Sequence, residues 1–535
     1  MMHIDSDSAA PSLRVLDEAM RRRTFAVISH PDAGKSTLTE SMALHAHVVD
    51  EAGVTHGKAH RAASISDWGE VERERGISIT SSALRFDYQD VVFNLLDTPG
   101  HSDFSEDTYR VLTAVDFAVM LIDAAKGMEA QTRKLFDACR RLGLPVVTVI
   151  NKWDRPGLEA LELFDEIQEV TSRTPVAVNW PVGYAGKFRG LLEPGASTYL
   201  RHEVVASGAR QADETIVDGA TDRDLDEGTW RDATEGVGVA AELNGTFTAQ
   251  PFLDGEQTPV LFTAAAGNIG VRSLLDFLVR HAPAPRPRHD ETGTPRPLDA
   301  ELAGYVFKIQ AGMNPAHRDQ VAFVRVNSGV FERGMELRHA QTGRPVSSKY
   351  AHHLVGRNRE TIAESWPGDV VGFVNTTGLH VGDTIHEGRP VTFPGMPRFD
   401  PERFRVARSL DAARNKRFVK GLAQLEDDGT VQILRDANGS PGGPVLAAVG
   451  ELQFEVAVER MRREFGVAIA LDAPMPYDRS RPFARSEVGR IAPIVGVEVL
   501  YRPSGEPIAL FPDRWRLSRV QERFPEIFPE PVSRT

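Results

Sequence analysis

Cysteine, long apolar runs and an excess of positive charge are scarce or missing in this sequence. The single cysteine, Cys139, excludes an internal disulfide framework and a zinc centre built on cysteines, and we expect it to be an inert packing residue of a helix at 132–142. No apolar run approaches the ~20 residues of a membrane span, and the polar N-terminus 1–23 lacks the apolar stretch of a signal peptide. We therefore expect a soluble, cytoplasmic protein with no membrane partner.

The formal net charge is −13, from 62 basic and 75 acidic residues. This balance argues against attraction of nucleic acid to the whole surface, and we expect no DNA partner, but it leaves room for a local basic patch. The densest positive run comprises Arg403, Arg405, Arg408, Arg414, Lys416, Arg417 and Lys420. These side chains either meet RNA phosphates or form a solvated face that nearby acids balance.

Short apolar runs alternate with helical patterns over the first half of the chain. The runs at 25–29, 91–96, 117–122, 145–150 and 260–262 are typical of strands that helices cover on both faces. This pattern predicts an α/β domain with a mostly parallel sheet over 1–285. It is interrupted by an insertion at about 156–258, where a helix at 161–169 leads into an acidic stretch at 211–242 to which we assign no chemistry.

A proline-rich segment at 281–298 predicts a semi-rigid linker between the first two domains. Short alternating runs at 304–309, 321–326, 334–338 and 369–374 predict a small antiparallel β-barrel over 298–390. The remainder, 398–535, is predicted to be an α+β domain. In it a strand at 445–449 leads into a helix that places Phe454, Val458, Met461 and Phe465 on one buried face.

A glycine-containing turn follows the first predicted strand and opens a helical pattern, which is the setting that a phosphate-binding loop needs. Lys35 would bridge the β- and γ-phosphates of a nucleotide, and the Ser36 hydroxyl would ligate Mg²⁺. Loop amides and the helix N-terminus would face the phosphate oxygens. Ser29 stands where the usual pattern has glycine. Taken alone, Gly34-Lys35-Ser36 therefore also fits a helix-capping turn beside an incidental lysine.

A second polar turn, Asp97-Thr98-Pro99-Gly100, follows the strand at 91–96. Asp97 would hold the magnesium through water, and Gly100 would let its amide approach the γ-phosphate because it has no side chain. The alternative is an ordinary Pro-Gly turn after a strand. The turn at 97–100 lies in the sequence between Gly34-Lys35-Ser36 and a further motif at Asn151, and this order favours a nucleotide site over an ordinary turn.

Two further residues, Thr80 and His101, are predicted to act next to the γ-phosphate. Thr80 ends a polar segment at 53–80 and would reach the magnesium only beside an intact γ-phosphate, or else it simply begins a strand. His101 directly follows Gly100 and is placed to orient the attacking water, which makes it the candidate catalytic residue; the alternative is a solvent histidine after a turn.

The motif Asn151-Lys152-Trp153-Asp154 predicts which purine is bound. The Asp154 carboxylate can accept hydrogen bonds from N1–H and the exocyclic amino group of guanine, whereas adenine has an acceptor at N1 and no such amino group. Sites of this kind discriminate by roughly 10⁴–10⁵. Asn151 would fix the loop and touch the purine, and the Lys152 stem would lie over its face. A backbone amide near Ala264 and Ala265, expected at Ala265, should meet guanine O6 unless this is only a small-residue turn.

With these motifs in place, the sequence resembles the translational GTPases. The resemblance rests on three runs of residues: Ser29-His30-Pro31-Asp32-Ala33-Gly34-Lys35-Ser36-Thr37, Asp67-Trp68 with 72–80, and Asp97-Thr98-Pro99-Gly100-His101. Within that group, the Ser29-His30-Pro31 opening resembles the bacterial peptide chain release factor 3 family of class II release factors. The runs at 307–311, 315–319, 321–323 and 449–454 support the same likeness, which covers about 23–478.

The resemblance implies a GTP-binding domain, a translation-factor β-barrel and an α+β domain that contacts the ribosome. It implies a GTPase that binds terminating ribosomes, drives off the class I release factor after peptide release and leaves after hydrolysis. GTP or GDP and Mg²⁺ would be bound, and Asp32 matches a residue linked in relatives to a monovalent cation. Ribosomal RNA and proteins would be direct partners and class I release factors indirect ones, and we expect a monomer.

Two other functions stay open on the residues alone. One is another translational GTPase, of the elongation or ribosome-protection type, which would need further C-terminal domains that this chain lacks. The other is a GTP-gated binding scaffold with little turnover, against which His101 and Thr80 speak.

Overall fold

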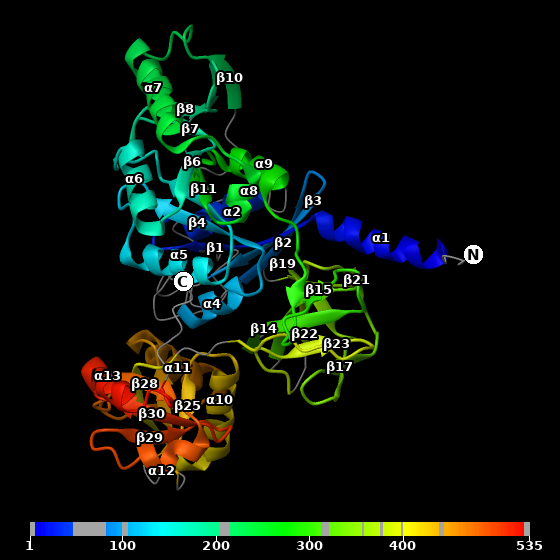
Figure 1. Ribbon diagram of the computed structural model, residues 1–535, viewed down its shortest axis with the longest axis vertical. Helices are drawn as coiled ribbons and strands as arrows, with labels where there is room; N and C mark the ends of the chain where they lie inside the picture. The colour runs from blue at the N-terminus through cyan, green and yellow to red at the C-terminus, as the bar shows by residue number, and fades with distance from the viewer. Residues whose placement is uncertain are drawn as a thin grey trace.

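The computed structural model arranges the chain in three units that follow one another along the sequence (Figure 1). It describes residues 6–46, 82–98, 105–202, 214–311, 320–355, 358–374, 378–396, 400–437 and 443–528. The first unit is built on a large, mostly parallel sheet, the second on an antiparallel sheet, and the third on strands and helices together. Within these described ranges, no helix is long and apolar enough to cross a membrane.

Seven strands form the main sheet of the first unit, in the order β2-β3-β1-β4-β5-β11-β6. Every neighbouring pair is parallel except β2 with β3. The strands are β1 (Arg22–Ser29), β2 (Ser82–Tyr88), β3 (Val91–Asp97), β4 (Phe117–Asp123), β5 (Val146–Asn151), β6 (Thr174–Ala177) and β11 (Gln257–Phe262). The five strands predicted for this unit are thus confirmed, and with them the α/β fold class.

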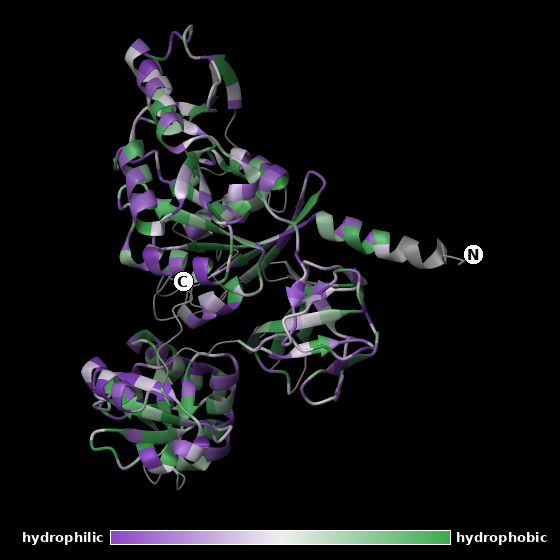
Figure 2. Cartoon of the chain, in the orientation of Figure 1, coloured by the Kyte–Doolittle hydropathy of each residue, from purple (hydrophilic) through white to green (hydrophobic). Residues whose placement is uncertain are grey.

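Helices cover both faces of the main sheet because its strands are apolar on both sides, as the green strands of Figure 2 show. One face packs against α4 (Ser105–Leu112), α5 (Ala130–Arg141) and α6 (Ala160–Thr171). The other packs against α2 (Lys35–His45), α8 (Ala249–Leu253) and α9 (Val271–His281). Cys139 lies in α5, and its burial raises the pKa of the thiol to about 12. The predicted packing role of this cysteine is therefore confirmed.

Part of the segment 156–258 belongs to the main sheet, because β6 pairs with β11. The rest builds a small antiparallel sheet in the order β10-β9-β8-β7, and α7 (Glu227–Asn244) packs on β6 and β7. The strands are β7 (Trp180–Val182), β8 (Gly190–Leu192), β9 (Thr198–His202) and β10 (Glu214–Asp218). The Asp226 side chain caps α7 by accepting a hydrogen bond from the Thr229 amide. The described part of the acidic stretch at 211–242 therefore holds a strand and a capped helix.

The second unit is an antiparallel sheet of eight strands in the order β18-β17-β23-β14-β15-β22-β19-β20, which curves into a barrel (Figure 1). Its strands are β14 (Ala303–Ala311), β15 (Gln320–Ser328), β17 (Leu337–His339), β18 (Pro345–Val346), β19 (Ala351–Val355), β20 (Asn358–Thr361), β22 (Val370–Val374) and β23 (Thr384–His386), with a separate pair β16 (Phe331–Glu332) and β21 (Glu364–Ser365). Three predicted strands are confirmed as β14, β15 and β22. The predicted strand at 334–338 is wrong over most of its length, because Gly334 lies in a turn with φ 95° and β17 begins at Leu337.

The proline-rich segment at 281–298 contains a short hairpin of β12 (Arg288–His289) and β13 (Pro295–Arg296). The Arg288 guanidinium lies 3.9 Å from the ring centroid of Tyr305 in β14. Its Nη1 donates to the Thr113 carbonyl of the first unit at 3.0 Å. This single side chain therefore ties the connecting segment to both units that it joins.

The third unit has two sheets, in the orders β25-β26-β24-β27 and β28-β30-β29. Its strands are β24 (Arg403–Ser409), β25 (Gln432–Leu434), β26 (Val445–Ala448), β27 (Ile469–Leu471), β28 (Arg479–Pro482), β29 (Glu498–Tyr501) and β30 (Pro507–Phe511), and its helices are α10 (Asn415–Asp427), α11 (Glu451–Phe465), α12 (Val488–Ile491) and α13 (Arg514–Arg523). The predicted strand at 445–449 is confirmed as β26. The predicted apolar stripe lies on α11, where Phe454 and Met461 are buried and Val458 and Phe465 pack against the same core.

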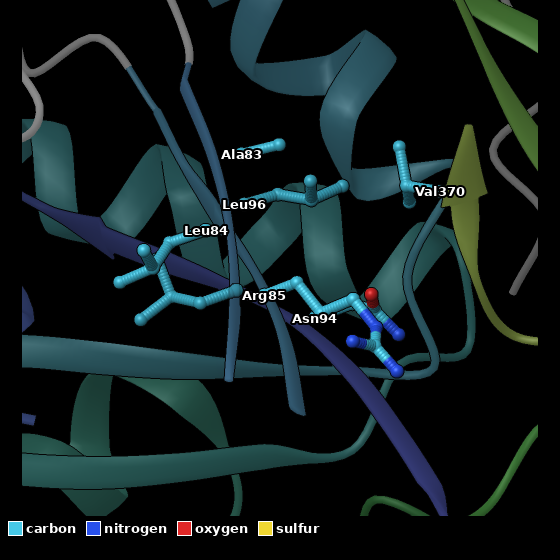
Figure 3. Close-up of a pocket in the computed structure, with 7 residues that line it drawn as sticks. Ala83, Leu84, Arg85, Asn94, Leu96 and Val370 are labelled. Atoms are coloured by element: carbon cyan, nitrogen blue, oxygen red, sulfur yellow. The ribbon is translucent and has the colours of Figure 1, made fainter. Parts of the chain in front are cut away.

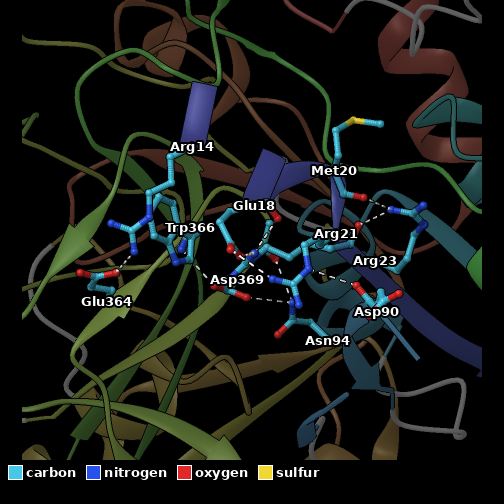
Figure 4. Close-up of polar contacts among 12 residues, drawn as sticks. Arg14, Glu18, Met20, Arg21, Arg23, Asp90, Asn94, Glu364, Trp366 and Asp369 are labelled. Atoms are coloured by element: carbon cyan, nitrogen blue, oxygen red, sulfur yellow. Dashed lines mark hydrogen bonds and ion pairs between the residues drawn. The ribbon is translucent and has the colours of Figure 1, made fainter. Parts of the chain in front are cut away.

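The first two units meet along β1, where the N-terminal helix α1 (Ser6–Met20) also joins the barrel (Figure 4). Arg22 Nε lies 2.9 Å from Asp369 Oδ2, and both side chains are almost fully buried. Glu18 of α1 completes this network, with its Oε2 at 2.7 Å from Arg22 Nη1. Farther out, Arg14 pairs with Glu364 at 3.1 Å on the surface. The junction thus has a buried ionic centre and an exposed ionic edge.

A small pocket adjoins this junction, between the β2–β3 hairpin and β22 (Figure 3). Its lining residues are Ala83, Leu84, Arg85, Asn94, Leu95, Leu96 and Val370. Asn94 Nδ2 donates to the Gly368 carbonyl and to Asp369 Oδ1, each at 3.3 Å. One wall of the pocket is therefore part of the contact between the two units.

We expect Asp369→Ala to loosen the junction, because it leaves the buried Arg22 guanidinium with Glu18 as its remaining carboxylate. Removing one partner of a buried ion pair costs about 3–5 kcal/mol. At about 2–4 °C per kcal/mol for a large domain such as the first unit, that corresponds to a fall of roughly 6–20 °C in Tm, measurable by calorimetry. Glu364→Ala is the matched control. It breaks only the exposed pair with Arg14, so its Tm should fall by less than about 4 °C. Equal losses in the two variants would contradict this account.

Candidate nucleotide-binding site

The turn between β1 and α2 has the backbone that a phosphate-binding loop requires. Asp32 and Gly34 both have positive φ, 66° and 100°, and α2 begins at Lys35 immediately after Gly34. A Cβ at position 34 would lie 2.5 Å from Asn151 Nδ2, so only glycine fits there. The turn therefore delivers the amides at the N-terminus of α2 to one place, where the helix carries partial positive charge.

The predicted phosphate-binding lysine and the predicted magnesium carboxylate lie together in this structure. Lys35 Nζ donates to Asp97 Oδ1 at 2.5 Å, and both side chains are buried. Ser36, the other predicted metal ligand, is the next residue on α2 and is half-buried. Thr98 instead supports the strand end, since its hydroxyl donates to the Val27 carbonyl at 2.9 Å. A hydroxyl and a carboxylate are oxygen ligands of the kind that Mg²⁺ prefers, so the donor set fits this ion.

Asn151 joins the phosphate-binding loop to the loop after β11. Its side-chain Nδ2 donates to the Ala33 carbonyl at 2.9 Å. Its Oδ1 accepts from the Thr263 hydroxyl and from the Ala265 amide, each at 3.0 Å. The side chain is 2 % exposed, so each of these bonds is shielded from water. Two loops that are more than 100 residues apart in sequence are held together by one amide group.

Lys152 extends from a residue with a left-handed backbone (φ 66°) and also returns to the phosphate-binding loop. Its Nζ donates to the Asp32 carbonyl and to Asp123 Oδ2, the latter at 2.8 Å. Asp123 is a residue that the sequence motifs alone do not predict. The signal that could have found it is a carboxylate at the end of β4, the strand that pairs with the one that ends at Asn151.

The backbone at Asp154 is held in place by its buried neighbour, Trp153. Trp153 is buried, packs nearly perpendicular to Phe262 with ring centroids 4.8 Å apart, and donates from Nε1 to the Gly183 carbonyl at 3.2 Å. Its amide also donates to the Thr263 carbonyl at 3.2 Å. The Asp154 side chain itself is exposed. A carboxylate is thus presented to solvent from a rigid support beside the loop at 263–265.

The loop after β11 is closed by a backbone bridge between Ala264 and Ile269. Ser41 of α2 donates from its hydroxyl to the Ala265 carbonyl at 2.8 Å. The Ala265 amide, which we predict to read guanine O6, donates to Asn151 in this structure. Its contact with a base stays a prediction. The side chains of Ala264 and Ala265 are both buried, so only the backbone of this loop is available to a ligand.

The Ser29-His30-Pro31 opening is held by local bonds and by a contact with α5. The Ser29 hydroxyl donates to the His30 carbonyl at 2.9 Å. His30 Nδ1 lies 2.8 Å from both the Pro31 carbonyl and Glu129 Oε2, the side chain of the residue that precedes α5. Glu129 was not predicted from the sequence, because nothing local marks a partner so far along the chain.

Four predicted site residues, Thr80, Pro99, Gly100 and His101, lie outside the described residues. Thr37 lies exposed in the first turn of α2. Among the residues that the structure describes, no three or more His, Cys, Asp or Glu side chains gather in a metal-binding group. The described part of the site therefore brings together Lys35, Ser36, Asp97, Asn151, Lys152 and the 263–265 loop at the carboxyl ends of β1, β3, β5 and β11.

Comparison with known families divides the chain as the three units do. Residues 20–284 match the elongation factor Tu GTP binding domain, residues 301–388 match elongation factor G domain 2, and residues 393–521 match the C-terminal domain of class II release factor RF3. A crystal structure of a protein from Thermus thermophilus aligns with a TM-score of 0.70 and 21% identity, covering 91% of this chain and 72% of that one. At this identity the alignment supports the fold alone.

Similar sequences cover almost the whole chain. A peptide chain release factor 3 from Gloeobacter violaceus is 42% identical over 519 residues, which is 95% of this chain and 97% of that protein. One from Microcystis aeruginosa is 41% identical over 515 residues, or 95% and 94% of the two chains. One from Nostoc punctiforme is 42% identical over 520 residues, or 95% and 94%.

Proposed function

The chain belongs to the peptide chain release factor 3 family, and from that premise we propose that it drives class I release factors off terminating ribosomes after peptide release. It is a translational GTPase of termination. GTP, GDP and Mg²⁺ are the ligands that a GTP-binding domain of this family binds. The match of its third unit to the class II release factor C-terminal domain favours this function over an elongation or ribosome-protection factor.

The observation that carries the proposal is the bonding of Asn151 to both Ala33 and Ala265. These bonds hold the loop expected to bind phosphates at a fixed distance from the loop expected to bind the base. A guanine nucleotide that spans the two loops would therefore find both ends of its site already in place, which limits the entropy lost on binding.

We assign the phosphate end of the site to Ser29, His30, Pro31, Asp32, Ala33, Gly34, Lys35, Ser36 and Thr37. Lys35 would exchange its bond with Asp97 for the β- and γ-phosphate oxygens. Ser36, Thr80 and Asp97, the last through water, are the residues that would hold Mg²⁺. When bound, Mg²⁺ neutralises charge on the phosphate oxygens. We also propose that the exposed Asp32 lies near a monovalent cation.

We assign the base end to Asn151, Lys152, Asp154 and the Ala264–Ala265 backbone, with Asp154 selecting guanine. Thr98, Pro99 and Gly100 would line the γ-phosphate, and His101 would orient the water that attacks it. A water-positioning residue without help is slow, so fast hydrolysis should need the ribosome to hold His101 in place.

Ribosomal RNA and proteins are the proposed direct partners, and the class I release factor is reached through the ribosome. We propose that the protein works in the cytoplasm, without a membrane or DNA partner, and as a monomer.

Turnover on ribosomes tests this function. Purified post-termination ribosomes should raise the rate of GTP hydrolysis by ~10³-fold or more, the scale on which a partner activates a slow GTPase. His101→Ala should remove this stimulation while equilibrium binding of GTP is unchanged. A rate that ribosomes leave unchanged would overturn the proposal and support a GTP-gated scaffold instead.

Release of a labelled class I factor from the same ribosomes tests the second half of the proposal. Release should occur with GTP and depend on this chain. If hydrolysis is stimulated but the class I factor stays bound, the protein is a ribosome-dependent GTPase with another task. A non-hydrolysable GTP analogue then separates the step that frees the class I factor from the step that frees the GTPase itself.

A further inference from the structure

The last described helix, α13, divides cleanly into a buried and an exposed face. Its N-terminus is capped by the Asp513 carboxylate, which accepts from the Arg516 amide at 2.6 Å. Leu517 and Val520 point into a small core formed with Phe511 and Phe528. This core fixes the rotation of α13 about its axis, and therefore fixes which side chains face solvent. Figure 1 draws α13 in red at the edge of the third unit.

The exposed face carries one aromatic ring in a row of cations. Trp515 is 63 % exposed, and it is the one large exposed hydrophobic side chain among the described residues of α13. Arg519, one turn later, places its guanidinium carbon 5.0 Å from the indole centroid. Arg523, one further turn along, lies 5.2 Å from the ring of Phe524. Spacings of four residues put Trp515, Arg519 and Arg523 on one stripe of the helix.

These cations are not neutralised by acids within the described part of the protein. The helix contains four arginines and one glutamate, and Arg514, Arg519 and Arg523 form no ion pair with any described residue. In the basic run singled out from the sequence, three of the seven cations are paired with acids, Arg405 with Glu451, Arg408 with Asp472 and Arg414 with Asp411. That run also differs from α13 in having no exposed aromatic ring over 403–420. Within a chain of net charge −13, α13 is thus a local site of unpaired positive charge beside an open ring.

We propose that this face of α13 is an RNA-binding site, on which an unpaired base stacks against the Trp515 indole. Arg519 supports the ring from one side, and Arg514 and Arg523 are placed to contact phosphates on either side of the stacked base. Exposed aromatic rings flanked by arginines bind single-stranded nucleic acid in this way, largely without regard to sequence. That the nucleic acid is RNA rests on the proposed function; the stacking site itself does not.

An unstructured, uridine-rich 12-nucleotide RNA with a fluorescent label is the probe, and the full chain is used without ribosomes or GTP. Trp515→Ala should raise the Kd by about tenfold, because one stacked base contributes on this scale. Trp515→Phe should keep most of the affinity, since it retains a flat ring. Arg514→Gln and Arg523→Gln should each flatten the salt dependence, lowering the slope of log K against log salt by about 0.7.

Leu410→Ala and Arg462→Gln are the matched controls, because they remove an equally exposed apolar side chain and an exposed, acid-paired cation elsewhere in the same unit. Both should leave the Kd within about twofold. Unchanged melting and basal GTP hydrolysis in Trp515→Ala would show that the fold is intact. RNA substituted with 4-thiouridine should crosslink to the α13 peptide.

The proposal is overturned if Trp515→Ala binds the RNA as the native chain does, or if its crosslinks map outside α13. It is also overturned if a base-free polyphosphate loses affinity to the same degree, because stacking would then not be involved. If Trp515→Ala binds the RNA as the native chain does but no longer binds a protein that the native chain binds, α13 is a protein interface instead. Because ribosomes and GTP are absent, none of these results depends on the proposed termination function.

Discussion

Replacing Asp154 with asparagine should lower the affinity for GTP by roughly 10³-fold or more and raise the affinity for xanthosine triphosphate. The carboxylate is expected to accept two hydrogen bonds from guanine, whereas the asparagine amide would turn a donor toward donors on the base. Xanthine carries a carbonyl where guanine carries the amino group, so the new amide can donate to it. The effect is large because unpaired polar groups at a base-reading site are heavily penalised.

Competition against a fluorescent guanine nucleotide measures both affinities in one experiment. Asp165→Asn is the control, since Asp165 is an exposed carboxylate on the nearby helix α6 that faces no predicted ligand. It should bind GTP as the native chain does. If Asp154→Asn also binds GTP normally and does not gain xanthosine triphosphate, the assignment of the base-reading residue is wrong.

Asn151→Ala should abolish measurable GTP binding and also destabilise the first unit. The substitution removes three buried hydrogen bonds and leaves the Ala33 carbonyl, the Thr263 hydroxyl and the Ala265 amide without that partner. Each buried group left unsatisfied costs about 1–3 kcal/mol, so the free energy of unfolding should fall by roughly 3 kcal/mol or more. That corresponds to a Tm lower by at least about 6 °C.

Thr263→Val separates the loss of one hydrogen bond from the loss of all three bonds that Asn151 makes. It removes the bond from the Thr263 hydroxyl and keeps the shape of the side chain. Its Tm should fall by only about 2–4 °C, for a cost of about 1 kcal/mol, and GTP binding should persist. A Thr263→Val variant that is as damaged as Asn151→Ala would show that Asn151 is not the centre of the site. Calorimetry and nucleotide titration on the same samples decide this.

The elements that the sequence predicts well are those that short-range patterns determine. Strands β1, β3, β4, β5 and β11 are continuous apolar runs that end at polar turns, and each candidate motif follows one of them. Once the strands are parallel, their carboxyl ends must share one edge, so Lys35, Asp97 and Asn151 had to meet. Their proximity is therefore a consequence of the topology.

The features that the sequence does not predict depend on partners far along the chain. Asp123 and Glu129 are ordinary acids until the sheet places them beside Lys152 and His30. Arg288 lies in what reads as a proline linker, and its role depends on Tyr305 and Thr113 in two different units. The error at 334–338 has another cause, because the left-handed Gly334 belongs to a turn whose flanking residues still alternate like a strand.

Helix α4 begins just after the 97–101 motif and touches both other units. Asp107 Oδ2 lies 3.9 Å from Lys308 Nζ in the barrel, and Arg110 Nη1 donates to the Asp428 carbonyl of the third unit at 3.4 Å. A Cβ on Gly429 would collide with the same arginine, so the Arg110 guanidinium packs directly against this turn. Helix α4 therefore contacts the second and the third unit at the same time, and any tilt of this helix imposed at the nucleotide must displace both contacts together.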